Sequence, residues 1–110
     1  MPTFITTGRL TKSGAEGLME KPEDRMPALN ALADAVGAKI LSYHLTTGRN
    51  DFVMITEGPN MESAVSAIMV AMTSGSVTDV ETVQAWTSEE FAEIAKTAGG
   101  IVGKYHGPGS

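Results

Sequence analysis

The chain contains no cysteine, so disulfide bonds, thiolate metal sites and a cysteine nucleophile are all excluded. It has no run of lysine and arginine, and its net charge of −5 at pH 7 disfavours binding to nucleic acid through phosphate groups. No apolar run approaches the roughly 20 residues that span a bilayer, and the N-terminus lacks the charged and apolar segments of a secretion signal. We therefore expect a cytoplasmic protein with neither a membrane nor a nucleic acid as its partner.

Aromatic residues are scarce, at 5% of the chain, so aliphatic residues, alanine and methionine must supply most of the core. The seven methionines indicate either an adaptable interior or an apolar contact surface. A length of 110 residues suits one domain with a single modest core.

The spacing of apolar residues predicts the elements of this domain. Runs rich in β-branched and aromatic residues predict strands over residues 3–9, 39–47, 52–57 and 77–86. Periodic apolar residues with capping signals predict helices between Asp24 and Gly37, between Asn60 and Gly75, and from Thr87 to the Gly99-Gly100 pair. A single helical turn is expected near residues 18–21.

The element order, β-α-β-β-α-β plus a terminal helix, is that of the ferredoxin-like α+β fold. Residues 1–98 would form this domain, and residues 99–110 a Gly-rich C-terminal tail whose last four residues take no part in the functional argument. The terminal helix is expected to turn Phe91, Ile94, Ala95 and Ala98 inward. Both long helices would cover one face of the sheet, so the other face needs polar residues or a partner.

Alternation along the strands assigns side chains to these two faces. Leu41, Tyr43, Leu45, Val53 and Ile55 are predicted to face the helices, whereas Ser42, His44 and Thr46 are predicted on the open face. Candidates for lining a ligand pocket on the open face are Phe4, Thr6, Phe52, Met54, Thr82, Gln84 and Trp86. Because this face is too apolar for water, a second copy of the chain is expected to cover it in a homodimer or a higher oligomer.

His44 is the candidate catalytic residue, because an imidazole exchanges protons near neutral pH. The alternative is a histidine that is hydrogen-bonded at a subunit interface. Asp51 follows the predicted hairpin turn, where its carboxylate either accepts backbone hydrogen bonds or acts as a second, weaker catalytic candidate. His44 and His106 are not spaced as a metal-binding pair, so no metal site is predicted.

Three segments resemble GYD-domain proteins, a family of small bacterial and archaeal proteins named for a Gly-Tyr-Asp signature. These segments are the Met-Pro-Thr-Phe start, the Gly48-Arg49-Asn50-Asp51 turn and the Thr87-Ser88-Glu89-Glu90-Phe91 helix start. Asn50 stands where the signature has tyrosine. The resemblance covers residues 1–98 and implies a dimeric α/β-barrel, but little chemistry, because the family is largely uncharacterised. Similar barrels include cofactor-free monooxygenases, isomerases, decarboxylases and haem proteins, which is an analogy of fold alone.

Two functions stay open at the level of the sequence. The first is a small oligomeric α/β-barrel protein, enzyme or not, that binds a small molecule in a pocket on the open sheet face, with no cofactor specified. The alternative is a non-catalytic oligomerisation or regulatory module whose sheet face is filled by its partner. A cavity that touches His44 would favour the first function.

Overall fold

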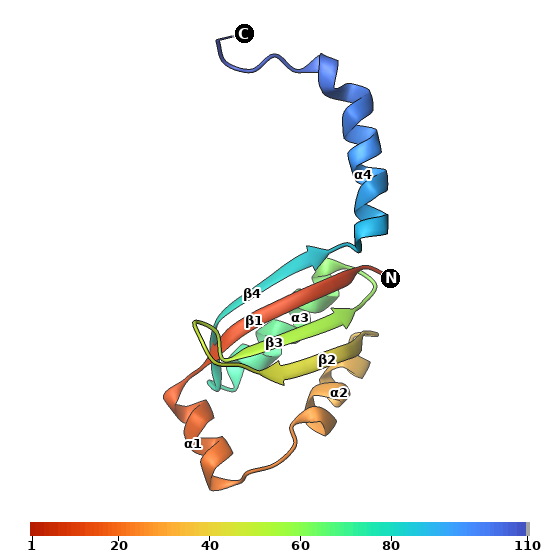
Figure 1. The fold of residues 1–110 in the computed structure, drawn as a ribbon. Coiled ribbons are helices and arrows are strands. Elements are labelled where there is room, and N and C mark those ends of the chain that lie inside the picture. Colours follow the sequence, from red (N-terminus) through yellow and green to blue (C-terminus); the bar gives the residue numbers. More distant parts are fainter. Residues whose placement is uncertain (110) are drawn as a thin grey trace.

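A four-stranded antiparallel sheet forms the centre of the chain in a computed structural model that describes residues 1–109 (Figure 1). The strand order is β2-β3-β1-β4, with bounds Thr3–Leu10 for β1, Lys39–Leu45 for β2, Phe52–Glu57 for β3 and Val77–Ala85 for β4. Helices α2 (Met26–Ala35) and α3 (Met61–Thr73) lie on one face, with α2 against β2 and α3 against β4. This arrangement confirms the predicted ferredoxin-like α+β fold.

Helix α1 (Lys12–Glu20) is longer than the single turn predicted near residues 18–21. The hydroxyl of Thr11 caps it by accepting a hydrogen bond from the Gly14 N–H at 3.0 Å, and it donates to a carbonyl of the α3–β4 turn at 2.6 Å. Gly14 is buried against the backbone of Ser76, where an added Cβ atom would overlap the carbonyl oxygen. A tertiary contact that requires glycine therefore holds α1 against the rest of the domain.

The corner between β2 and β3 is tied to the end of β1. Gly48 has a φ of 97°, the left-handed region that favours glycine. The Asp51 carboxylate accepts a hydrogen bond from the Leu10 N–H at 2.9 Å, and the Asp51 N–H donates to the Gly8 carbonyl at 2.8 Å. The bond from Leu10 confirms that the Asp51 carboxylate accepts a backbone hydrogen bond, as predicted.

The pairing of β2 with β3 shows that part of the predicted face assignment is wrong. Tyr43 pairs with Met54, and Leu45 pairs with Phe52. Both Met54 and Phe52 therefore lie on the helix side with Tyr43, although they were predicted on the open face. The reason is the length of the loop between β2 and β3. An even number of residues separates Leu45 from Phe52, so these two residues pair and share a face. A shift of one residue in this register would move every side chain of the strand to the opposite face.

The same correction applies to β1 and β4. Phe4 is only 1% exposed and lies under the helices, as does Thr6, and their pairing places Gln84 and Thr82 on that side of the sheet too. The predicted placement of these four residues on the open face is therefore wrong. By the same pairing the open face carries Ile5 and its neighbours Ile55 and Val83, together with the correctly placed Ser42 and His44.

Helix α4 (Ser88–Ile101) projects away from the sheet and makes 60 Å the longest extent of the chain, against 32 and 22 Å in the other directions (Figure 1). The predicted capping box is present: the Thr87 hydroxyl accepts from the Glu90 N–H, and the Glu90 carboxylate accepts from the Thr87 N–H. The helix does not end at Gly99-Gly100 but continues to Ile101 and into the 3-10 turn η1 (Val102–Lys104).

The predicted inward packing of α4 is also wrong. Phe91, Ile94, Ala95 and Ala98 are all exposed, because the helix leaves the body of the domain instead of lying on it. The apolar periodicity of the sequence is present in α4, yet these side chains stay exposed in the described part of the chain, and Phe91 contacts Trp86.

Candidate functional site

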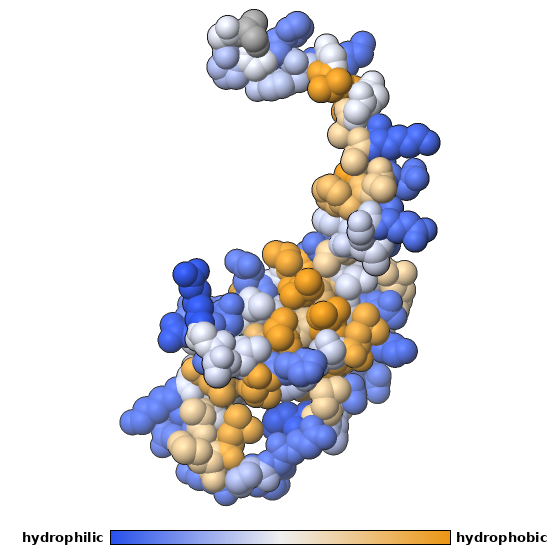
Figure 2. Space-filling view, viewed as in Figure 1, coloured by the Kyte–Doolittle hydropathy of each residue, from blue (hydrophilic) through white to orange (hydrophobic). Residues whose placement is uncertain are grey.

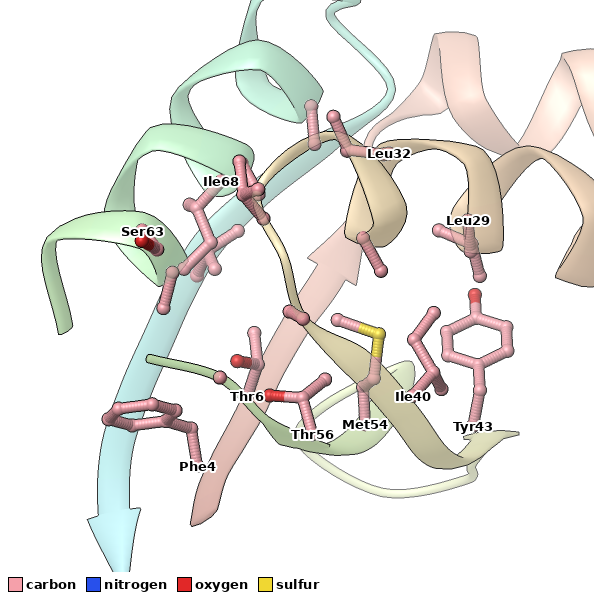
Figure 3. A pocket seen from close by; sticks show the side chains of 18 of the residues that line it. Phe4, Thr6, Leu29, Leu32, Ile40, Tyr43, Met54, Thr56, Ser63 and Ile68 are labelled. Carbon is pink, nitrogen blue, oxygen red and sulfur yellow. The ribbon is translucent and has the colours of Figure 1, made fainter. Parts of the chain in front are cut away.

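An apolar cleft lies between α2 and α3, with the central strands β1 and β3 as its floor (Figure 3). Its volume is about 130 Å³. The apolar walls come mainly from Phe4, Leu29, Leu32, Ile40, Met54 and Ile68. A dry apolar cavity of about 150 Å³ holds a molecule the size of benzene, so this cleft suits a small apolar ligand.

The polar groups at the cleft are few. The hydroxyls of Thr6 and Thr82 hydrogen-bond each other at 2.8 Å, which satisfies both in a part-buried position. Thr56 and Ser63 add two further hydroxyls to the lining, and Tyr43 points its ring into the cleft from β2. Among the described residues that line the cleft, Tyr43 carries the one titratable side chain.

Burial raises the pKa of the Tyr43 hydroxyl above its ordinary value of 10.0, and the positive charge of Arg25 opposes that rise. The phenol therefore stays protonated at neutral pH and can donate a hydrogen bond to a ligand. A phenol in this state does not serve as a general base near neutral pH. The apolar walls and this donor suit the cleft to binding a small molecule.

The structure brings together four of the seven predicted pocket residues, but on the other face of the sheet. Phe4, Thr6, Phe52 and Met54 line the cleft beneath the helices, and Thr82 adjoins it through its hydrogen bond with Thr6. Gln84 and Trp86 are exposed and lie outside the lining. The residue types therefore predicted pocket residues correctly in four cases. The prediction placed them on the wrong face because it assumed a different register for the hairpin.

The catalytic candidates lie apart from this cleft. His44 is exposed on the open face, paired with Val53, and it belongs neither to the cleft nor to a second concavity beside Leu18 and Leu45. The Asp51 carboxylate is engaged with the backbone of β1. The cavity that the sequence-based hypothesis required at His44 is absent from the two concavities described for residues 1–109.

The outer side of α3 is an apolar surface that sequence reasoning missed. Val65, Met69 and Met72 recur at i, i+4 and i+7, and all three are exposed, with Met69 at 62%. Ala64 and Ile68 occupy the inner side and line the cleft. The signal was the width of the apolar pattern, because a helix that covers a sheet needs one apolar stripe and α3 carries apolar residues on both sides.

The described ion pairs are exposed, and Glu23 takes part in two of them. Arg25 and Glu23 are 2.9 Å apart, Lys21 and Glu23 are 3.7 Å apart, and Arg9 and Asp79 are 3.8 Å apart. Exposed pairs of this kind contribute little to stability. Within residues 1–109 no group of three or more potential ligands could hold a metal ion, and no helix is long and apolar enough to cross a bilayer.

The chain is similar to a protein family and to a bacterial protein. The GYD domain model matches residues 4–95, which include the whole sheet from Phe4 onward and the first part of α4. A protein of Thermus thermophilus named "Glutamine synthetase and cystathionine beta-lyase binding protein" is 31% identical over 77 residues. That alignment covers 70% of this chain and 81% of the relative.

Proposed function

Because the chain belongs to the GYD-domain family and is similar to a protein named for the two enzymes that it binds, we propose that it is a non-catalytic protein-binding module. Its partner would be a metabolic enzyme of the kind named for the relative. The observation that carries the proposal is the exposed apolar stripe of Val65, Met69 and Met72 on α3.

This stripe has the chemistry of a docking surface. A helix at the surface of a monomer normally exposes a polar side, whereas these three side chains form a connected apolar strip beside Glu62 and Ser66. Methionine side chains are flexible and polarizable, and they adapt to partners of different shape. A helix of this kind binds by laying its apolar side into a groove on the partner.

The two enzymes in the relative's name, glutamine synthetase and cystathionine β-lyase, are the partners to test. Each purified enzyme would be immobilised, and binding of the parent chain measured by surface plasmon resonance. Met69→Lys should weaken binding at least tenfold, because it places a charge in the apolar groove, and tenfold corresponds to about 1.4 kcal/mol.

Met19→Lys is the matched control. Met19 is an exposed methionine of α1, 72% exposed against 62% for Met69, so the same substitution there should leave binding unchanged. Equal losses for the two variants, or no binding of the parent chain to either enzyme, would contradict the proposal.

The cleft between α2 and α3 supports a second function, the binding of a small apolar molecule. Phe4, Thr6, Phe52 and Met54 would contact the ligand, and the Tyr43 hydroxyl would donate to a polar atom at its edge. Benzene can serve as the probe, with methyl shifts of Met54 and Leu32 in NMR spectra as the readout. Ala67→Leu, which fills the cleft, should remove these shifts, whereas Ala28→Leu on the exposed side of α2 should keep them.

A further inference from the structure

A β-bulge in β2 directs Tyr43 into the cleft. Ile40 and Tyr43 are three residues apart, so a regular strand would place their side chains on opposite faces of the sheet. The register of β2 against β3 shifts between Ile40 and Ser42, and both Ile40 and Tyr43 line the cleft on the helix side. Leu41 is the extra residue of this bulge and is exposed. Bulges re-aim side chains and are common beside binding sites, so the placement of Tyr43 indicates a role at the cleft.

Tyr43 also lines the second concavity, so it lies where the two hollows meet. Figure 2 shows a hollow between α1 and the rest of the domain, with apolar and charged residues beside each other at its rim. In Figure 3 the Tyr43 ring stands at the end of the cleft away from Phe4, and its hydroxyl is directed toward α2. The cleft therefore has an apolar inner part and a polar mouth at Tyr43. The walls of the second concavity include Leu18, Arg25, Met26 and Leu45.

Arg25 supplies a positive charge at this mouth. Burial raises the pKa of the Tyr43 hydroxyl, and the charge of Arg25 acts on the same hydroxyl in the opposite direction. The neutral phenol is a hydrogen-bond donor beside this cation. A negatively charged group of a ligand at the Tyr43 hydroxyl would thus meet both a donor and a positive charge.

Two carboxylates at the second concavity already have partners. The Glu23 carboxylate accepts a hydrogen bond from Arg25 Nη1 at 2.9 Å and lies 3.7 Å from the Lys21 ammonium, so one anion faces two cations. The Asp24 carboxylate accepts a hydrogen bond from the Met26 N–H at 2.9 Å. A guanidinium has five N–H donors in a planar fork, so Arg25 can hold a second carboxylate beside Glu23.

The inner part of the cleft offers no partner for a charge. Its described lining holds no charged side chain, and the hydroxyl of Thr6 is engaged with that of Thr82 at 2.8 Å. Burying an ionised carboxylate there without a partner would be strongly unfavourable. An acid that enters the cleft would therefore bury its apolar part and leave its carboxylate at the Tyr43 end.

We propose that the cleft binds a small carboxylic acid in its anionic form, with the apolar body between α2 and α3 and the carboxylate at the mouth. The carboxylate would accept a hydrogen bond from the Tyr43 hydroxyl and pair with the Arg25 guanidinium. This inference rests on the small-molecule function proposed above for the cleft, and it adds the class of ligand. The volume of about 130 Å³ suits an apolar body of about six carbon atoms, the size of benzene.

Phenylacetate and phenylacetamide separate the effect of charge from that of shape, because they differ in the head group alone. Binding of each is followed in NMR titrations through the methyl shifts of Met54 and Leu32, with benzene as the probe of the apolar cleft itself. Phenylacetate should bind the parent chain about tenfold more tightly than phenylacetamide, because hydrogen bonds to charged groups are stronger than neutral ones.

Arg25→Gln should abolish the preference for phenylacetate. The Arg25 side chain makes no capping hydrogen bond to α2, so the helix should keep its start in this variant. Arg9→Gln is the matched control, since it removes the same charge from an exposed arginine that lines neither concavity, and it should keep the preference. Tyr43→Phe, which removes only the hydroxyl, should reduce the preference about threefold.

Glu23→Gln should act in the opposite direction. It removes the carboxylate that accepts a hydrogen bond from Arg25, so phenylacetate should bind about threefold more tightly than to the parent chain. Glu16→Gln, at an exposed position of α1, removes the same charge and should leave the affinity unchanged.

The possible failures are distinguishable. If none of the three probes shifts the methyl signals, both the binding function of the cleft and the carboxylate inference are wrong. If benzene binds but phenylacetate and phenylacetamide bind equally, the cleft is an apolar site and only the carboxylate inference is wrong. Equal losses in Arg25→Gln and Arg9→Gln, or no tighter binding in Glu23→Gln than in Glu16→Gln, would likewise overturn the role of Arg25.

Discussion

Two glycines of α1, three residues apart, should respond with opposite sign to the same substitution. A Cβ atom at Gly14 would overlap the backbone carbonyl of Ser76, whereas a Cβ atom at Gly17 meets nothing within 4 Å. Alanine in a helix interior is favoured over glycine by about 0.5–1 kcal/mol, and this gain applies at both positions. Overpacking against a fixed backbone costs about 1–3 kcal/mol and applies at Gly14 alone.

The net expectation is a loss of about 0.5–2 kcal/mol for Gly14→Ala and a gain of about 0.5–1 kcal/mol for Gly17→Ala. Thermal unfolding followed by circular dichroism resolves this difference, because about 1 kcal/mol moves the midpoint of a domain of this size by about 4–8 °C. Gly17→Ala serves as the matched control for helix propensity. Two stabilised variants would refute the close contact between α1 and the turn before β4.

The hairpin corner and Tyr43 give three further expectations. Gly48→Val should cost about 1–3 kcal/mol in urea unfolding, because valine at a φ of 97° is strained. Asp51→Ala removes the hydrogen bond from Leu10 and should cost about 1 kcal/mol, whereas Asp51→Asn, which keeps an acceptor, should cost less. Burial raises the pKa of Tyr43, so the stabilisation from its neutral form is fully present below pH 10 and is lost as the pH rises further. Alkaline unfolding should therefore be steeper in the parent than in Tyr43→Phe, and identical slopes would contradict the buried hydroxyl.

The elements with strong local signals were predictable from the sequence. The run of apolar and β-branched residues predicted β3 with its observed bounds. The Thr87–Glu90 capping box predicted the start of α4 correctly. Helix α1 was missed because Gly14 and Gly17 lower helix propensity. The contact of Gly14 with Ser76, far away in sequence, outweighs that local preference.

The face assignment failed for a reason that local patterns do not contain. Val53 and Ile55 are as apolar as Phe52 and Met54, so both sides of β3 look suitable for burial. The length of the β2–β3 turn decides between them, and the hydrogen bond from the Thr46 N–H to the Asp51 carbonyl closes the turn at that length. Predicting the cleft thus required the register of the hairpin, not only the composition of its strands.

His44 shows the same limit for the candidate site. A histidine amid apolar neighbours was a reasonable acid–base candidate, yet pairing with Val53 places it on the open face, away from the cleft. The neighbouring strand was expected to bring Phe52 and Met54 to the same face as His44, which suggested a shared pocket. In the observed register Met54 pairs with Tyr43 and Phe52 pairs with Leu45, so both lie on the face opposite His44.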